Sequence, residues 1–133
     1  MKSYKVSFTV STTTTTNQRA NISLHGTTAS SSRGQVFLDG QPLCNAAIGN
    51  NSPGTWDFNA ANVVCKELGF STAANFYRRT CQFGDCMDDN WIRSGITCTG
   101  DETSILDCAH DPTIAEECDS AAVDMVGVEC REN

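Results

Sequence analysis

The stretch that decides the fold is Trp56-Asp57-Phe58-Asn59-Ala60-Ala61-Asn62-Val63-Val64-Cys65-Lys66-Glu67-Leu68-Gly69. It predicts an α-helix over about residues 59–68, because its apolar residues recur at the spacing of one helix face. Asp57 or Asn59 can cap the start, and Gly69 stands where a left-handed residue commonly ends a helix. The stripe that needs burial consists of Ala61, Val64, Cys65 and Leu68.

Strands are predicted on both sides of this helix, where polar and apolar residues alternate. Asp39-Gly40 between two of them is a strong signal for a two-residue hairpin turn. We expect polar loops over 27–32 and 71–95, and a short helical turn over 103–108. The expected strands are residues 4–10, 21–25, 34–40, 41–48, 95–98 and 123–129.

Length and composition limit the class of protein. The chain has 133 residues, of which 39% are hydrophobic and 19% charged, so it can form one domain with a modest core. No apolar run reaches the length that a membrane span needs. We therefore expect no direct membrane insertion. The net charge is −7 and no basic stripe is present, which excludes a typical nucleic-acid-binding protein.

Eight cysteines indicate the compartment. Zinc sites usually contain close cysteine pairs, and here only Cys81 and Cys86 are close, with both histidines far away. Four disulfides in an oxidising compartment fit better, although spacing alone leaves the pairing open. Glycosylation sequons at Asn21 and Asn50 agree with an extracellular location, secreted or on an ectodomain.

The N-terminus lacks the pattern of a signal peptide, so we expect this chain to be a piece of a longer precursor expressed without one. Residues 12–16 are a threonine run, which is typical of a linker. We therefore expect an N-terminal extension or linker over residues 1–19 and one domain over residues 20–131.

Four segments in this order resemble a scavenger receptor cysteine-rich (SRCR) domain. They are a strand pair over Arg33–Gln41, the helix stretch quoted above, a Cys-x9-Cys segment over Cys98–Cys108 and a closing strand over Val126–Cys130. The resemblance implies a small α+β fold, in which a curved antiparallel sheet cradles one main helix with long loops. It also implies the bridges Cys44–Cys118, Cys65–Cys130 and Cys98–Cys108. That leaves a Cys81–Cys86 pair, either as a fourth bridge or, less favoured, as a redox switch.

Many relatives bind divalent cations through acids that this chain lacks after Cys44 and before Cys98. Calcium needs six to eight oxygen ligands, so we expect no cofactor and at most a weak calcium site. Asp57, Glu102 and Asp124 stand at or near the positions that relatives use. Three further acids that could form another site are Asp85, Asp88 and Asp89; solvated surface carboxylates are the simpler interpretation of all six.

A second, weaker resemblance concerns the front of the chain. Residues 4–10 and 20–26 resemble the opening strands of a PLAT (lipoxygenase homology) domain, although the chain lacks the room for a whole one. Residues 20–40 cannot serve both resemblances in full.

No catalytic triad, phosphate loop or metal-protease motif is present, so we expect no enzyme. The leading hypothesis is a non-catalytic ligand-binding or adhesion module of a larger secreted or cell-surface protein, which recognises a protein, glycan or polyanionic ligand through its loops. The alternative is a purely structural spacer module. We expect Trp56 and Trp91 in or near the core. The candidate ligand-binding residues are Tyr77, Arg78, Arg79, Phe83 and Arg93.

Overall fold

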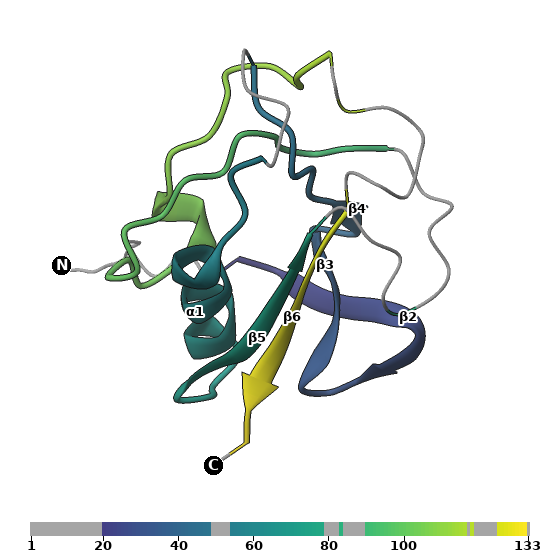
Figure 1. The fold of residues 1–133 in the computed structure, drawn as a ribbon, viewed down its shortest axis with the longest axis vertical. Helices are drawn as coiled ribbons and strands as arrows, with labels where there is room; N and C mark the ends of the chain where they lie inside the picture. Colours follow the sequence, from purple (N-terminus) through teal and green to yellow (C-terminus); the bar gives the residue numbers. More distant parts are fainter. Residues whose placement is uncertain are drawn as a thin grey trace, which may run out of the picture.

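The computed structural model describes residues 20–48, 54–78, 83, 90–116, 118 and 125–132. These residues form an antiparallel sheet of five strands and one main helix, as the resemblance implies (Figure 1). The expected strand over 4–10 and the threonine run lie outside the described residues. The elements are β2 (Ile22–Ser30), β3 (Arg33–Leu38), β4 (Gln41–Pro42), α1 (Phe58–Glu67), β5 (Thr72–Arg78), the 3-10 turn η1 (Ile105–Asp107) and β6 (Val126–Arg131).

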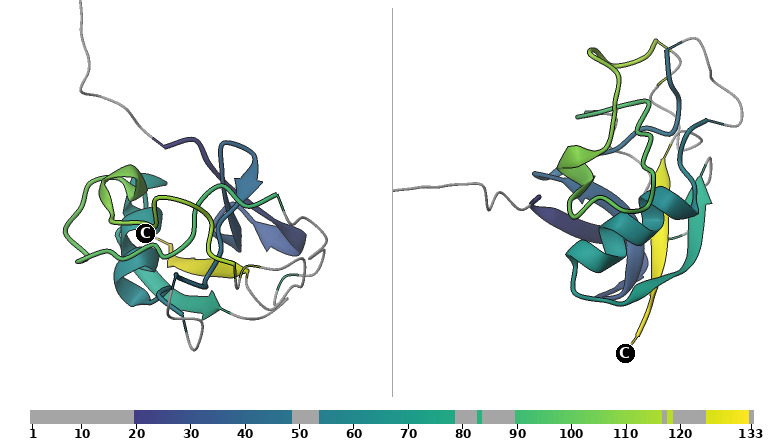
Figure 2. Two further views of the ribbon diagram at one scale, coloured as in Figure 1. Left: turned by 90° about the horizontal axis from the view of Figure 1, so that it is seen from above. Right: turned by 90° about the vertical axis from the view of Figure 1, so that its left-hand side faces the viewer.

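The strands do not lie in chain order. The sheet runs β2-β3-β6-β5, with β4 paired to β3, so the last strand of the chain lies between β3 and β5. The four pairings between these strands are antiparallel. Helix α1 lies across one face of the sheet, against β5 and β6 (Figure 2). The sheet is therefore complete only when the C-terminal strand β6 has inserted between β3 and β5.

The β3–β4 hairpin forms at the predicted turn. Asp39 and Gly40 have φ of 54° and 81°, which are the two left-handed residues of a type I′ turn. The predicted return strand to residue 48 is wrong, because β4 ends at Pro42. Beyond it, Leu43 and Cys44 make only isolated bridges, to Arg93 and Met125.

Helix α1 begins and ends at residues that the sequence marks. The Asp57 carboxylate accepts a hydrogen bond from the Ala60 N–H (3.1 Å) at the start. Gly69 has φ of 102°, and the N–H groups of Gly69 and Phe70 donate to the carbonyls of Lys66 and Cys65. This is the Schellman arrangement that terminates many helices.

Three sequence expectations are wrong. The polar loop over 27–32 is mostly strand, because β2 continues to Ser30. The loop over 71–95 begins with β5, and residues 95–98 contain only the Thr97–Ala109 bridge. Strand β5 shows no alternation because its pairing with β6 shifts between Ala73 and Asn75. An extra residue of this kind reverses the in–out phase of a strand.

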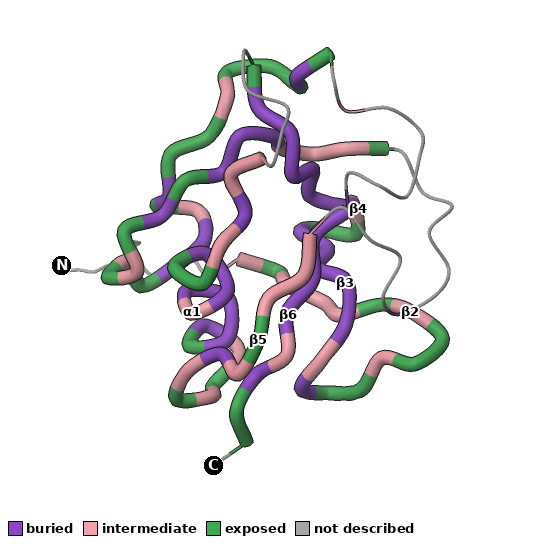
Figure 3. Tube along the Cα trace, viewed as in Figure 1, coloured by how far each residue is buried: buried purple, intermediate pink, exposed green. Residues whose placement is uncertain are grey.

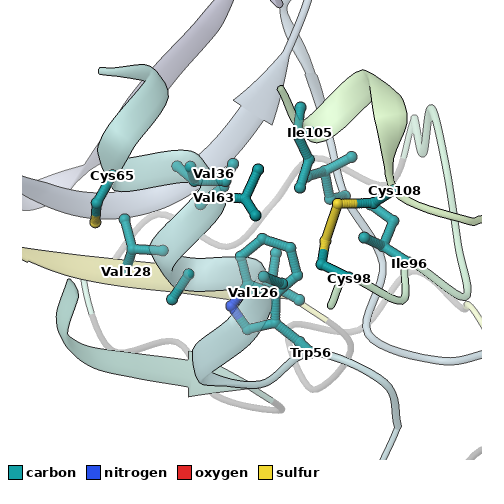
Figure 4. Close-up of a cluster of buried hydrophobic side chains, with 14 of the residues drawn as sticks. Val36, Trp56, Val63, Cys65, Ile96, Cys98, Ile105, Cys108, Val126 and Val128 are labelled. Carbon is teal, nitrogen blue, oxygen red and sulfur yellow. A yellow bond between two sulfur atoms is a disulfide. The ribbon is translucent and has the colours of Figure 1, made fainter. Parts of the chain in front are cut away.

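The core lies between α1 and the sheet and extends under η1 (Figures 3 and 4). Trp56 is almost fully buried at its centre, as expected, and its indole N–H donates to the Gly127 carbonyl (3.1 Å). Trp91 is half-buried. The largest other fully buried side chains are Leu38, Leu43, Ile96, Ile105 and Met125.

Among the described residues there are three disulfides: Cys44–Cys118 and Cys65–Cys130, which join segments far apart in the chain, and Cys98–Cys108, which closes a short loop. They are the pairs that the resemblance implies. Cys65–Cys130 ties α1 to β6, and Cys98–Cys108 lies inside the core beside Ile96 (Figure 4). Cys81 and Cys86 lie outside the described residues.

The front of the domain belongs to the same sheet. Ala20, Ile22 and Leu24 pack against the core, and the Ala20 N–H donates to the Glu67 carboxylate (2.7 Å). Residues 22–26 therefore serve the SRCR-like sheet as part of β2. Within the described part of the chain, no helix has the length and apolar character that crossing a membrane requires.

Candidate ligand-binding surface

The candidate ligand-binding residues do not form one surface. Tyr77 and Arg78 are neighbours in β5, so their side chains point to opposite faces of the sheet. Arg93 lies in a separate segment, where its carbonyl accepts from the Cys44 N–H (3.0 Å). Arg79 lies outside the described residues. The expectation of a single binding loop over 71–95 is therefore wrong.

Phe83 is a buried anchor and not an exposed contact residue, which corrects its predicted role. Only 3% of its surface is exposed. Its ring meets the Tyr77 ring edge to face at 5.3 Å, and the Arg33 guanidinium lies 5.1 Å from its centroid. Its carbonyl accepts from the Thr28 N–H and the Thr27 hydroxyl, both at 3.1 Å. A side chain held in this way cannot reach a ligand.

Tyr77 lies on the face of the sheet that Phe83 covers. Its hydroxyl donates to the Glu129 carboxylate at 3.0 Å. Partial burial, followed by the bond to Glu129, raises the pKa of Tyr77 above its usual value. The phenol is therefore protonated at neutral pH and serves as a donor within the domain.

On the helix side, β5 and the start of α1 present a different group of side chains, which we call the aromatic–arginine patch: Phe58, Phe76 and Arg78. The rings of Phe58 and Phe76 meet edge to face at 5.0 Å. The Arg78 guanidinium lies 5.3 Å from the Phe76 centroid, and one of its nitrogens donates to the Trp56 carbonyl at 2.8 Å. Phe58 is 44% exposed. The patch therefore joins the start of α1 to the edge strand β5.

Sequence reasoning does not single out Phe58. Its spacing to Ala61 and Cys65 continues the buried stripe of the helix, so periodicity predicts a buried ring. Phe58 is exposed because it is the first residue of α1, at the margin of the surface that the sheet covers. No sequence signal could have shown this.

The arginines of the described part of the chain have no acidic partner within 4.0 Å. Arg93 also has one guanidinium nitrogen that is buried without a hydrogen-bond partner, and Arg33 has a buried Nε in the same state. Because the chain has a net charge of −7, an anionic ligand should bind most favourably at arginines that no acid neutralises.

The predicted cation ligands are engaged elsewhere. The Asp57 carboxylate caps α1. The Glu102 carboxylate accepts from the N–H groups of Thr99 and Gly100, and these bonds, that of Thr99 most, lower the pKa of Glu102. Asp124 and the three other candidate acids lie outside the described residues.

One group of three potential metal ligands occurs among the described residues: Cys98, Glu102 and Cys108. The two cysteines are bonded to each other, so neither offers the thiolate that binds a metal. Directly after Cys44, where many relatives have acids, Asn45 is buried. Its side-chain carbonyl accepts a hydrogen bond from the backbone N–H of Trp56 (3.2 Å). The Asn45 side chain therefore holds the backbone at Trp56 and does not act as a cation ligand in this arrangement.

Of the two sequons, Asn21 is exposed at the residue before β2. Its carbonyl accepts from the Asp39 N–H (2.9 Å), so the backbone is fixed while the side chain faces solvent. Asn50 lies outside the described residues.

Comparison with known proteins gives one family. A model of the scavenger receptor cysteine-rich domain matches residues 24–131. The chain is 44% identical over 57 residues to the egg peptide speract receptor of Strongylocentrotus purpuratus, which is 43% of this chain and 10% of that receptor. It is 35% identical over 79 residues to lysyl oxidase homolog 2 of Mus musculus, which is 58% of this chain and 10% of that protein. A scavenger receptor cysteine-rich domain superfamily protein of Patiria pectinifera is 37% identical over 71 residues, 53% of this chain and 6% of that protein.

Proposed function

The chain belongs to the scavenger receptor cysteine-rich family, and on this premise we propose that it is a non-catalytic ligand-binding or adhesion module of a larger extracellular protein. The ligand class is a protein, a glycan or a polyanion. The observation that carries the proposal is the aromatic–arginine patch, which a rigid scaffold holds at the surface with an arginine that has no acidic partner among the described residues.

Rigidity supports binding because a preformed surface loses little conformational entropy when it meets a ligand. The three described disulfides and the two contacts of Arg78 restrict the patch before any ligand arrives. Aromatic residues and arginine are also the residue types that interfaces favour.

The extracellular location is part of the proposal. Disulfides persist in oxidising compartments, and three of them are described in this domain, two with both cysteines buried. The exposed Asn21 sequon is consistent with passage through a secretory pathway.

The matched stretches cover a tenth or less of the relatives named above. The receptor or oxidase activity in a relative's name belongs to that protein, and this proposal does not take it over. The proposed role is that of the domain alone, and it requires no cofactor; calcium, if it binds, binds weakly.

The test uses an array of glycans, sulfated ones included, and an array of purified ectodomains. The wild-type domain is compared with Arg78→Glu, which reverses the charge of the patch, and with Arg131→Glu, which makes the same change at the exposed end of β6. We expect at least one ligand whose capture falls with Arg78→Glu and persists with Arg131→Glu. Capture of nothing by the wild-type domain would favour the spacer module instead.

A calcium arm belongs to the same test. We expect capture to be unchanged by millimolar calcium or by chelator, because Asp57 and Glu102 already serve the backbone. A thermal midpoint that rises with calcium would show a cation site and overturn this part of the proposal.

A further inference from the structure

The aromatic–arginine patch has the chemistry of a specific contact. Phe58 is one of three large apolar side chains that are exposed among the described residues; the others are Ile48 and Ile114. Phe58 differs from those two in two ways. The Phe76 ring packs against it, with 5.0 Å between the ring centroids, and Arg78 extends the same surface. The patch thus offers an apolar surface and a cation side by side.

Arg78 is fixed in place but not neutralised. One nitrogen donates to the Trp56 carbonyl and the guanidinium stacks near Phe76, which together set its orientation. Its remaining N–H donors have no partner among the described residues, and no carboxylate oxygen lies within 4.0 Å. A guanidinium presents its donors in a planar fork that matches the two oxygens of a carboxylate.

The edge of β5 itself is blocked against an added strand. The Ala73 N–H donates to the Asn62 side chain at 2.8 Å, and the Phe76 N–H donates to the Asn75 side chain at 3.2 Å. The shifted register at Asn75 further breaks the edge. Native sheets use such devices to prevent strand pairing, so a partner at this edge is recognised by side chains and not by β-strand addition.

We propose that the patch binds an acidic segment of a protein partner, which places one carboxylate on Arg78 and a neighbouring apolar side chain on Phe58 and Phe76. This rests on the proposed function and narrows its ligand class. A protein segment fits better than a polyanion because the described patch holds a single cation. The net charge of −7 and the adjacent Asp57 carboxylate also repel a densely charged chain.

The experiment is selection from a displayed library of random heptapeptides on the immobilised wild-type domain. We expect enrichment of peptides in which Asp or Glu stands beside an aromatic or aliphatic residue. In two-dimensional amide NMR, a selected peptide should shift the signals of residues 56–58 and 76–78. Dextran sulfate serves as the polyanion probe in parallel.

Four variants make the selection decisive. Arg78→Gln should weaken the selected peptides by at least about tenfold, the size expected from losing a charge-assisted hydrogen-bonded pair. Phe58→Ser, at an exposed ring, should weaken them several-fold. Arg78→Lys keeps the charge but loses the fork and should fall between Arg78→Gln and the wild type. Arg131→Gln is the control and should bind as the wild type does.

Each outcome decides between the two proposals. Peptides that bind but ignore Arg78→Gln and Phe58→Ser would overturn the patch and leave a ligand-binding module standing. Binding of dextran sulfate that depends on Arg78, without enriched acidic peptides, would replace the protein segment by a polyanion. Failure of the domain to bind either probe, or any member of the arrays above, would overturn both proposals.

Discussion

The ring of Phe83 lies so close to Gly127 that a Cβ on residue 127 would stand 2.8 Å from Cε2. Gly26 makes a second close approach, because a Cβ there would meet the Phe83 Cβ within about the same distance. Two glycines from β6 and β2 thus leave the space that Phe83 occupies on the sheet.

Adding a methyl group at this contact should destabilise the domain. We expect Gly127→Ala to lower the free energy of unfolding by about 1–3 kcal/mol, since overfilled cores lose this much. Phe83→Ala alone should cost about 3–5 kcal/mol. In the Phe83→Ala background the added cost of Gly127→Ala should shrink, because the clashing ring is gone; a double-mutant cycle by urea unfolding measures this. Strict additivity would show that the two residues do not interact.

The buried Glu67 carboxylate joins the residues before β2 to the start of η1. Only 9% of its surface is exposed, and it accepts from the Ser104 hydroxyl and the N–H groups of Ile105 and Ala20. Glu67→Gln turns one acceptor into a donor and leaves a buried donor unsatisfied, which should cost about 1–3 kcal/mol of unfolding free energy. Ser104→Ala removes a single donor and should cost less. Equal stability of Glu67→Gln and wild type would contradict this account.

The two disulfides inside the core should differ in their contribution to the free energy of unfolding. Cys65–Cys130 closes a loop with a sequence separation of 65, against 10 for Cys98–Cys108. The chain-entropy model gives the longer loop an advantage of about 1.7 kcal/mol. We therefore expect the Cys65→Ala/Cys130→Ala variant to unfold at lower denaturant than Cys98→Ala/Cys108→Ala. The reverse order would show that packing around Cys98 outweighs loop entropy.

The Glu102 carboxylate should make stability depend on acid pH. Its folded-state pKa is lowered from the ordinary 4.5, chiefly by the Thr99 N–H. A lowered pKa stabilises the fold fully above about 4.5, and this contribution disappears as the pH falls through the folded-state value. The thermal midpoint of wild type should exceed that of Glu102→Gln at pH 7, with the gap closing below pH 4.5. Glu116→Gln, at another exposed carboxylate, is the control. A gap that stays constant with pH would refute the role of the charge.

Asn21 should carry a glycan when a eukaryotic secretory host makes the domain. Intact mass should fall on treatment with a peptide N-glycosidase, and part of that loss should vanish in Asn21→Gln. The side chain is exposed, so the substitution should leave the thermal midpoint near that of the wild type. An unchanged glycan mass in Asn21→Gln would show that the sequon is not used.

Local signals were sufficient for the helix and the β3–β4 hairpin. Asp57, Gly69 and the Asp39-Gly40 turn act within a few residues of their own position, so their pattern is legible in one sequence. The disulfide pairs required more than pattern: spacing left them open, and the family resemblance supplied the pairs that the structure contains.

Strand β5 shows why the remaining strand and the surface around it could not be predicted from the sequence. Its shifted register removes the alternation, and both of its faces are partly covered, by α1 on one side and by Phe83 on the other. A periodic pattern appears only where one face is buried and the other exposed. The sequence pattern therefore predicts a loop here with Tyr77 and Arg78 on one surface, whereas the sheet places these two side chains on opposite faces.

The sequence by itself determined the family, the α+β class, the capped helix and the type of cross-link, because each rests on motifs or on neighbours along the chain. Only the tertiary structure decided which side chains face solvent: it buried Phe83, exposed Phe58 and set Arg78 beside the Trp56 carbonyl, with no acidic partner among the described residues. Exposure at these positions depends on strand order and on loops that return from far along the chain. A single sequence carries no local record of either.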